Sequence, residues 1–383
     1  MINTREEIVN GLVEATELEH GLMVQYLYAA MTLKETTDEG LTPAQLNKVK
    51  HWALKIRGVA KQEMGHLATA LNLLEAVGGG SHLDRVRFPA RSRFYKPPIP
   101  FTLEPLTLDT IQRFINFEKP VHPVMAFDHI APEPVVFSQV GDLYGQIKTG
   151  ILGIDEKVLF IGRGSAQDRS AWSFAITVSP VTDRASAVAA IDSIVTEGEG
   201  NSTGTDQSHY GRFKGIQAEY KAELVADPKF QPFRSVLSNP ATQPGPDTTV
   251  IEVEDTLAAA ELFSACYTTL LLCLAKYYRF DETDDNQALL QGIAKNLMIY
   301  AVAPLGSLLS KLPANKEKNA GPPFEIYTLP SLPHDRDASL KLIRERMQVA
   351  KAFATGLAAR VTTDGVVQSI ADQLDVLSQT LPV

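Results

Sequence analysis

Residues 43 to 77 repeat apolar side chains in steps of three and four, the spacing of one buried face of an α-helix. The stripe consists of Leu46, Val49, Ala53, Ile56, Ala60, Leu67, Ala70, Leu74 and Val77. Glu63 lies on this stripe, and His66 projects from nearly the same face three residues later. Because an unpaired buried carboxylate is costly, the pattern predicts that Glu63 has a partner inside the protein.

A first helix is predicted for residues 4 to 35, where the same period recurs. Glu19 again falls on the apolar face, and Tyr26 follows it two turns later. The turn at 36–43 ends with Thr42, placed to cap the second helix, and Pro43 at the first helical position. Two helices of about thirty residues joined by a short turn predict an antiparallel pair.

Two further bundle helices are predicted after residue 183. The first has Ile191 and Ile194 on its stripe and runs into the sequence EGEG at 197–200. The second opens after the polar segment 201–205 with Asp206 and His209 on its stripe. Asp206 and His209 therefore repeat the i, i+3 spacing of the Glu-x-x-His pair in the second helix.

The rest of the chain is less regular between these helices and helical again after them. Residues 81–180 combine a proline-rich stretch, short helices at about 108–118 and 138–151, and two possible strands at 157–162 and 172–178 that would form a small hairpin. We interpret this block as an insertion that covers a site. A polar linker at 226–250 precedes helices at about 252–279, 286–312, 336–361 and 365–380. The predicted fold is all-α: a four-helix bundle with a lid insertion over 1–230, and a C-terminal helical extension over 250–383 packed on it.

Charge, cysteine content and apolar runs exclude several classes of partner and location. The net charge of −9 argues against nucleic acid or an anionic membrane as an obligatory partner. Cys266 and Cys273 have neither the number nor the spacing of a disulfide framework or zinc site. The N-terminal residues lack the apolar core of a signal peptide, and the most apolar run, 266–275, is too short to span a bilayer. We expect a soluble cytoplasmic protein that can form a homodimer.

The acids and histidines on apolar stripes predict a dimetal centre. Such a site takes one acid from each of two helices and an acid-x-x-His pair from each of the other two, and iron or manganese suits these ligands. The candidate ligands, in chain order, are Glu19, Glu63, His66, an acid at Glu197 or Glu199, Asp206 and His209.

Simpler explanations exist for each of these residues. Glu63 and His66 can form a buried hydrogen bond, and Asp206 can complement the helix dipole at a first turn. Helix phase does not choose between Glu197 and Glu199, and Glu261 is a further candidate acid. Tyr26 is either core packing or a proton or radical relay.

A third acid-x-x-His match, Glu17 with His20, points away from the stripe of the first helix. Glu17 lies about 160° and His20 about 100° round the helix from Glu19. We expect this pair on the surface.

Several local motifs carry a family resemblance. The run at 19–26 (EHGLMVQY) resembles the first-helix motif of bacterioferritin-like proteins, and EMGH at 63–66 stands where their first Glu-x-x-His stands. GEG at 198–200 followed by SHYGRF at 208–213 resembles the ferritin-like family that includes domains of iminophenylpyruvate dimer synthases, enzymes of bisindole pigment pathways. The resemblance implies a ferritin-like fold over about 5–225 and favours Glu199 over Glu197. The family usually has glutamate where this chain has the shorter Asp206.

Two functions follow from this reading. The first is a non-haem dimetal oxidoreductase, with two iron ions or manganese in their place, that activates dioxygen or peroxide against a small organic substrate. The second is a metal-binding ferritin-like accessory protein whose structural metal site performs no turnover. The bulk of the insertion favours the first function over iron storage, because it suggests a shaped organic pocket.

Overall fold

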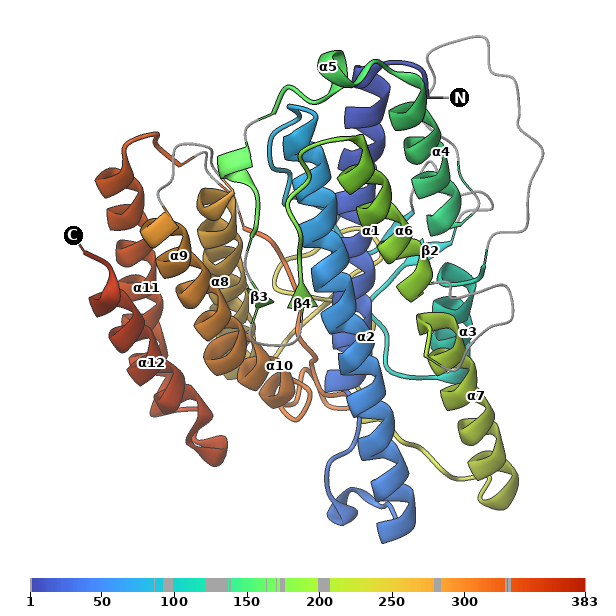
Figure 1. The fold of residues 1–383 in the computed structure, drawn as a ribbon. Coiled ribbons are helices and arrows are strands. Elements are labelled where there is room, and N and C mark those ends of the chain that lie inside the picture. Colours follow the sequence, from blue (N-terminus) through green and yellow to red (C-terminus); the bar gives the residue numbers. More distant parts are fainter. Residues whose placement is uncertain are drawn as a thin grey trace. The chain divides into compact units, whose positions relative to one another are not determined.

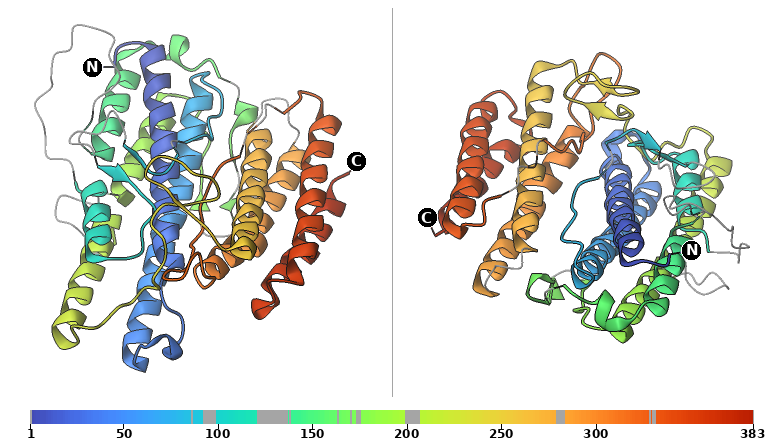
Figure 2. Two further views of the ribbon diagram at one scale, coloured as in Figure 1. Left: turned by 180° about the vertical axis from the view of Figure 1, so that it is seen from behind. Right: turned by 90° about the horizontal axis from the view of Figure 1, so that it is seen from above.

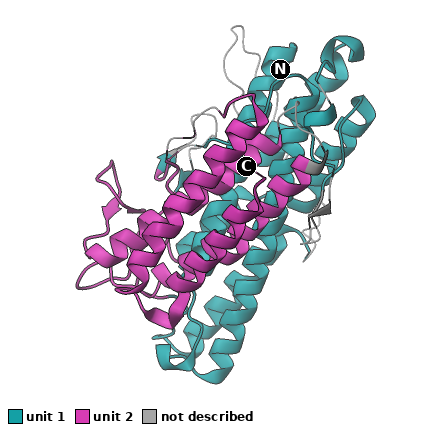
Figure 3. Ribbon diagram, turned by 90° about the vertical axis from the view of Figure 1, so that its left-hand side faces the viewer, with its two compact units in different colours: residues 1–86, 90–101, 106–233 teal, residues 87–89, 102–105, 234–383 magenta. Residues whose placement is uncertain are grey.

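A computed structural model describes residues 2–382 except 86, 92–98, 121–136, 138, 163, 170, 173–175, 199–206, 279–283, 328, 330 and 331. The described chain is mainly helical, so the all-α prediction is confirmed (Figure 1). It divides into two compact units (Figure 3). Unit 1 comprises residues 1–86, 90–101 and 106–233, and unit 2 comprises 87–89, 102–105 and 234–383.

Two long helices form one side of unit 1. Helix α1 spans Arg5–Met31 and α2 spans Pro43–Ala76, with the 3-10 turn η1 (Thr37–Glu39) between them. Each begins with a capping box: the hydroxyl of Thr4 or Thr42 accepts a hydrogen bond from the amide of the third helical residue, and the threonine amide donates one to the side chain of that residue. The predicted start of the second helix at Pro43 is confirmed.

Four shorter helices form the other side of the bundle. They are α3 (Leu108–Phe117), α4 (Val140–Gly153), α6 (Arg184–Gly198) and α7 (His209–Ala226). Helix α4 packs on α1 and α6, and α3 packs on α7, while α2 contacts both α6 and α7 (Figures 1 and 2). The 81–180 segment, expected as an insertion, thus supplies two helices to this packing.

The predicted hairpin is wrong in its first strand. Residues Glu156–Leu159 form the short helix α5, because the Asp155 side chain accepts a hydrogen bond from the Lys157 amide and so caps a helical turn. A small antiparallel pair does exist further along, between β3 (Ala171–Trp172) and β4 (Ile176–Thr177). Another antiparallel pair joins β1 (Ala90–Arg91) to β2 (Pro100–Phe101). The 3-10 turn η2 (Gly164–Ala166) precedes β3.

Unit 2 is built around the buried helix α8 (Glu254–Tyr277). The parallel pair β5 (Pro240–Ala241) and β6 (Thr249–Val250) precedes it. The helix predicted at 286–312 consists of α9 (Asp284–Leu297), a π-helical turn η3 (Met298–Val302) and α10 (Ala303–Leu309). The π turn precedes Pro304, which has no amide hydrogen to donate. Helices α11 (Arg336–Ala358) and α12 (Val366–Thr380), joined through η4 (Thr363–Gly365), complete the unit.

Two helical stretches of unit 2 are long and apolar enough to cross a membrane, Glu254–Tyr277 and Asn286–Leu309. Their most apolar windows are 78% and 50% buried inside the protein. Core helices of soluble proteins pass the same test, so this burial fits a soluble domain.

Candidate metal centre

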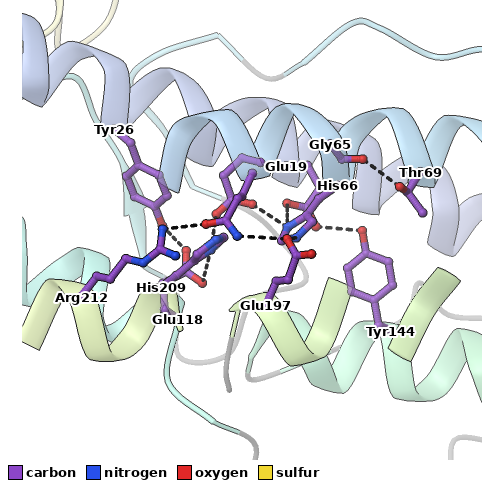
Figure 4. A network of polar contacts seen from close by, with 12 residues as sticks. Glu19, Tyr26, Gly65, His66, Thr69, Glu118, Tyr144, Glu197, His209 and Arg212 are labelled. Carbon is purple, nitrogen blue, oxygen red and sulfur yellow. Dashed lines mark hydrogen bonds and ion pairs between the residues drawn. The ribbon is translucent and has the colours of Figure 1, made fainter. Parts of the chain in front are cut away.

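Glu63 lies between His66 and His209 in the interior of unit 1. Figure 4 shows these two histidines close to the side chains of Glu19, Glu118 and Glu197. Its Oε2 is 2.8 Å from His66 Nδ1, and its Oε1 is 2.9 Å from His209 Nδ1. The two imidazole rings are 5.4 Å apart between centroids and are inclined by 29°. All three side chains are buried, and each offers one ligand atom within 4.8 Å of the others. The periodicity of α2 thus brings the predicted Glu63 and His66 together with the predicted His209 at the start of α7.

Glu19 approaches the same point from α1. Its side chain is buried, and Oε2 lies 3.8 Å from His66 Nδ1. Its other oxygen, Oε1, accepts a hydrogen bond of 2.8 Å from the Tyr144 hydroxyl, which α4 supplies. Glu19 is therefore held in place by a neutral donor from the segment that was expected as an insertion.

Glu118 is a site residue that the sequence reasoning missed. It forms the C-cap of α3, is 4% exposed, and places Oε2 at 3.5 Å from His209 Nδ1. Its Oε1 accepts a short hydrogen bond from the buried hydroxyl of Tyr26. A signal was available: Glu118 lies four residues after Phe114 and seven after Ile111, so it continues the apolar stripe of α3.

Glu197, in the last turn of α6, faces His66 from the more open side of the site. Its Oε2 is 3.4 Å from His66 Nε2 and accepts a hydrogen bond of 3.2 Å from Gln62. Gln62 in turn accepts a hydrogen bond of 2.7 Å from Arg212, so α2, α6 and α7 are linked here. Glu199 and Asp206 lie outside the described residues, and their assignment as ligands stays a prediction.

The charges of the cluster act on one another strongly. Burial, followed by repulsion from Glu63, raises the pKa of Glu19 to about 7. Burial lowers the pKa of His209, but the carboxylates of Glu63 and Glu118 outweigh it and raise the value to about 9. Burial likewise opposes the charged form of His66, yet its carboxylate neighbours hold its pKa well above the ordinary value. The histidines are thus the only cations here among the described groups that contact Glu63.

The donor set fits metal ions. Four carboxylates, those of Glu19, Glu63, Glu118 and Glu197, surround two imidazoles, so even two protonated histidines leave excess negative charge. Among the described residues, His66 Nε2 and both ring nitrogens of His209 are buried without a well-directed hydrogen bond. Buried polar atoms are rarely left this way in proteins. Two divalent cations would balance the four carboxylates and give neutral imidazoles a partner.

A small cavity of about 20 Å³ opens among these side chains, with Leu22 and Ile194 on its apolar border. A cavity needs about 10–15 Å³ on this measure to hold one water. The described cavity therefore has room for ions or water beside the carboxylates, and an organic molecule does not fit within it.

The expectation for Glu17 and His20 is wrong. His20 is fully buried, and burial followed by the charge of Arg85 lowers its pKa well below the ordinary value. Glu17 is half-buried and lies 3.0 Å from His82 Nε2. The non-helical segment around 82–85 covers this face of α1, and its placement cannot be read from helix periodicity.

Known proteins resemble the chain over most of its length. It is 27% identical over 392 aligned residues to dichlorochromopyrrolate synthase of Lentzea aerocolonigenes, covering 91% of this chain and 38% of that protein. It is 24% identical over 354 residues to 2-imino-3-(indol-3-yl)propanoate dimerase of Chromobacterium violaceum, covering 84% of this chain and 34% of that protein. The chain thus spans about a third of the length of the curated relatives it matches.

A solved structure and a family match agree on the fold. The crystal structure of a ferritin-like protein from Caulobacter vibrioides superposes with a TM-score of 0.54 at 17% identity, covering 85% of this chain and 99% of that one. Residues 12–218 match the ferritin-like family, over a range that contains Glu19, Glu63, His66, Glu118 and His209. The resemblance inferred from the sequence is confirmed, and this chain belongs to the ferritin-like family.

Proposed function

We propose that this chain is a non-haem dimetal oxidoreductase, with iron as the metal, that uses dioxygen or peroxide to oxidise a small organic substrate. One observation carries the proposal: Glu63 presents one oxygen to each of two buried histidines, and His66 Nε2 and both ring nitrogens of His209 have no well-directed hydrogen bond among the described residues. Imidazole and carboxylate are the donors that iron and manganese take in such bundles.

These side chains would hold the two ions together. Glu63 would be shared between them, with His66, Glu19 and Glu197 nearer one ion and His209 and Glu118 nearer the other. Asp206 and Glu199 remain proposed ligands that would join this set. Bound iron would supply the redox change that activates the oxidant.

Two tyrosines hold the outer carboxylates. Burial, followed by the charge of Glu118, raises the pKa of Tyr26 well above its ordinary value, and burial followed by Glu19 does the same for Tyr144. Both hydroxyls therefore stay protonated and donate to Glu118 and Glu19, which fixes the orientation of each carboxylate.

Aromatic packing keeps the Tyr26 side of the centre dry. The Tyr26 ring lies 4.6 Å from Phe114 and 4.9 Å from Phe213 between centroids, and all three are fully buried. Exclusion of water strengthens every electrostatic interaction at the centre. In this role Tyr26 positions Glu118, and it is also the candidate proton relay of the centre.

The relatives favour turnover over a purely structural metal site, because one is named a synthase and the other a dimerase. We propose aromatic 2-imino acids as the first substrate class to test, and oxidative coupling as the first reaction. The free, buried thiols of Cys266 and Cys273 suit the reducing cytoplasm as the place of action.

Metal content and turnover test the proposal together. Protein reconstituted with ferrous iron is analysed for bound metal and then given an aromatic imino acid, which an added amino-acid oxidase generates from the amino acid and dioxygen with release of peroxide. Oxygen and peroxide are followed, and the oxidase measured without the chain gives the background that is subtracted. We expect two ions per chain and substrate-dependent consumption of the oxidant in the wild type, and loss of both in Glu63→Gln. The variant Glu17→Gln makes the same charge change on α1 away from the centre and should retain both. Metal that raises the melting temperature without any substrate driving consumption of oxidant would reject the enzymatic proposal.

A further inference from the structure

A second hollow lies in unit 2, between α8 and α11, and shares no lining residue with the metal centre. Its volume is about 660 Å³, within the range of about 300–1,000 Å³ that small-molecule sites occupy. Apolar side chains line most of it, among them Leu262, Ala265, Val349 and Phe353. Val349 and Phe353 are 71% and 40% exposed, so apolar surface stands open to solvent along one face of α11.

Helices α8 and α11 run antiparallel, which fixes the two ends of the groove. Arg360, just past α11, pairs with Asp255 in the first turn of α8 at 2.8 Å, and Lys276 near the end of α8 lies 3.4 Å from the carbonyl of His334 just before α11. Arg346 therefore lies toward the Thr269 end. Phe353 lies toward the other end, where α8 carries Glu261. Glu261 and Thr269 are eight residues apart on α8, which is about 12 Å at 1.5 Å per residue.

Arg346 is the cation of this groove. Its side chain is half-buried, and burial lowers its pKa with no acidic group offsetting the shift. Among the described residues it makes neither an ion pair nor a hydrogen bond. A guanidinium stays protonated in proteins, so this one bears a partly desolvated charge without a partner.

Hydrogen bonds hold a third part of the lining, outside α8 and α11, in place. The Tyr327 amide donates to Thr268 Oγ1 at 3.0 Å, and the Glu325 carboxylate accepts from the Thr242 amide at 3.0 Å and from its hydroxyl at 2.5 Å. Tyr327 and Thr242 both line the groove. The hollow is thus bounded by α8, by α11 and by the residues around Thr242 and Tyr327, which these hydrogen bonds hold in place.

We propose that this groove binds a small monocarboxylate with an apolar body. The carboxylate would take the two parallel donors of Arg346, and the body would lie along Val349 and Phe353. The acidic residues select against other occupants: Glu261 stands at the far end and Glu345 at the exposed rim, so a second negative charge on the ligand would meet repulsion. A neutral ligand of the same shape would leave the Arg346 charge unpaired.

Calorimetric titration of the full chain tests this with three probes. These are 3-phenylpropionate, octanoate, and 3-phenylpropanamide, which has the shape of the first without its charge. We expect at least one carboxylate to bind the wild type with a stoichiometry of one, at least about tenfold more tightly than the amide, because one hydrogen-bonded charge pair contributes on that scale. Comparison of the two carboxylates tells an aromatic from an aliphatic body.

Variants locate the site. Arg346→Gln should weaken carboxylate binding about tenfold or more while leaving amide binding unchanged. Val349→Asp, at a side chain exposed enough to tolerate the change, should weaken it similarly by placing a like charge beside the ligand. Lys341→Gln removes an exposed charge from the same helix outside the groove and should change nothing. The proposal is overturned if no carboxylate binds at millimolar concentration, if the amide binds as tightly, or if both Arg346→Gln and Val349→Asp bind like the wild type.

Discussion

Glu19→Gln should stabilise the metal-free protein against unfolding, and the same substitution should weaken metal binding. Burial and then Glu63 raise the pKa of Glu19 from 4.5 to about 7 in the folded chain. Above pH 7 the ionised carboxylate therefore costs about 3 kcal/mol, at 1.36 kcal/mol per pKa unit. Glutamine carries no such charge, and its carbonyl can still accept the Tyr144 hydrogen bond.

The sign of the pH dependence follows from linkage. Because the folded pKa lies above the unfolded one, folding takes up a proton between pH 4.5 and 7, and the contribution of Glu19 to stability is lost as the pH rises through that window. At pH 8 the variant should therefore melt roughly 6–12 °C above chelator-treated wild type, for a domain of this size. At pH 4.5 the two should melt within about 2 °C of each other, since Glu19 is then largely protonated when folded.

Thermal unfolding at both pH values, with and without added manganese or iron, measures this. Metal should raise the melting temperature of the wild type at pH 8 by more than that of the variant. Glu17→Gln serves as the matched control and should differ little from the wild type at either pH. A metal-free Glu19→Gln protein no more stable than the wild type at pH 8, or equally shifted at both pH values, would refute the electrostatic reasoning.

Three further changes probe the same interior. Tyr144→Phe removes only the hydroxyl that orients Glu19, so metal affinity should fall about 10–100-fold in a metal titration; unchanged affinity would exclude a positioning role. Glu118→Gln should reduce bound metal from two ions to one per chain by elemental analysis, and a retained second ion would contradict its place in the centre. Burial raises the pKa of Glu75 to about 7, so the free energy of unfolding should fall as the pH rises from 4.5 to 7 and this carboxyl ionises inside the fold. Glu75→Gln should therefore gain on the order of 1 kcal/mol at pH 8 and little at pH 4.5, measured by denaturant unfolding; an equal gain at both would argue against this.

The part of the centre that could be predicted is the part on long helices. Glu19, Glu63 and His66 occupy apolar stripes of α1 and α2, where period alone fixes the face on which a residue lies. His209 follows the same rule near the start of α7. Thr42 and Pro43 also predicted where α2 begins. The Thr42 hydroxyl accepts a hydrogen bond from a free amide of the first turn, and Pro43 stands where no amide hydrogen is needed.

What was missed depends on contacts between distant segments. Glu118 reaches the site through packing of a ten-residue helix, and its partner Tyr26 is 92 positions away. The apolar stripe of α3 places Glu118 on the buried face, but only the packing of α3 on α7 brings it to His209. His20 is buried by a non-helical segment whose course no local pattern describes. At 157–162 the apolar run favoured a strand, but the cap from Asp155 provides the hydrogen-bond partner that starts a helical turn instead.

The candidate metal centre takes some side chains from the middles of helices and others from helix ends, and these two groups differ in how they tolerate insertions and deletions. Glu19, Glu63 and His66 lie inside uninterrupted helices, so one residue gained or lost between Glu63 and His66 would turn the imidazole by about 100° away from its carboxylate. Glu118 closes α3, Glu197 lies in the last turn of α6, and His209 opens α7. A residue gained or lost beyond the end of α3 or α6 therefore does not rotate Glu118 or Glu197 about its own helix. Sequence length is therefore constrained within α1 and α2, whereas the opposite wall of the candidate centre tolerates changes beyond its helix ends.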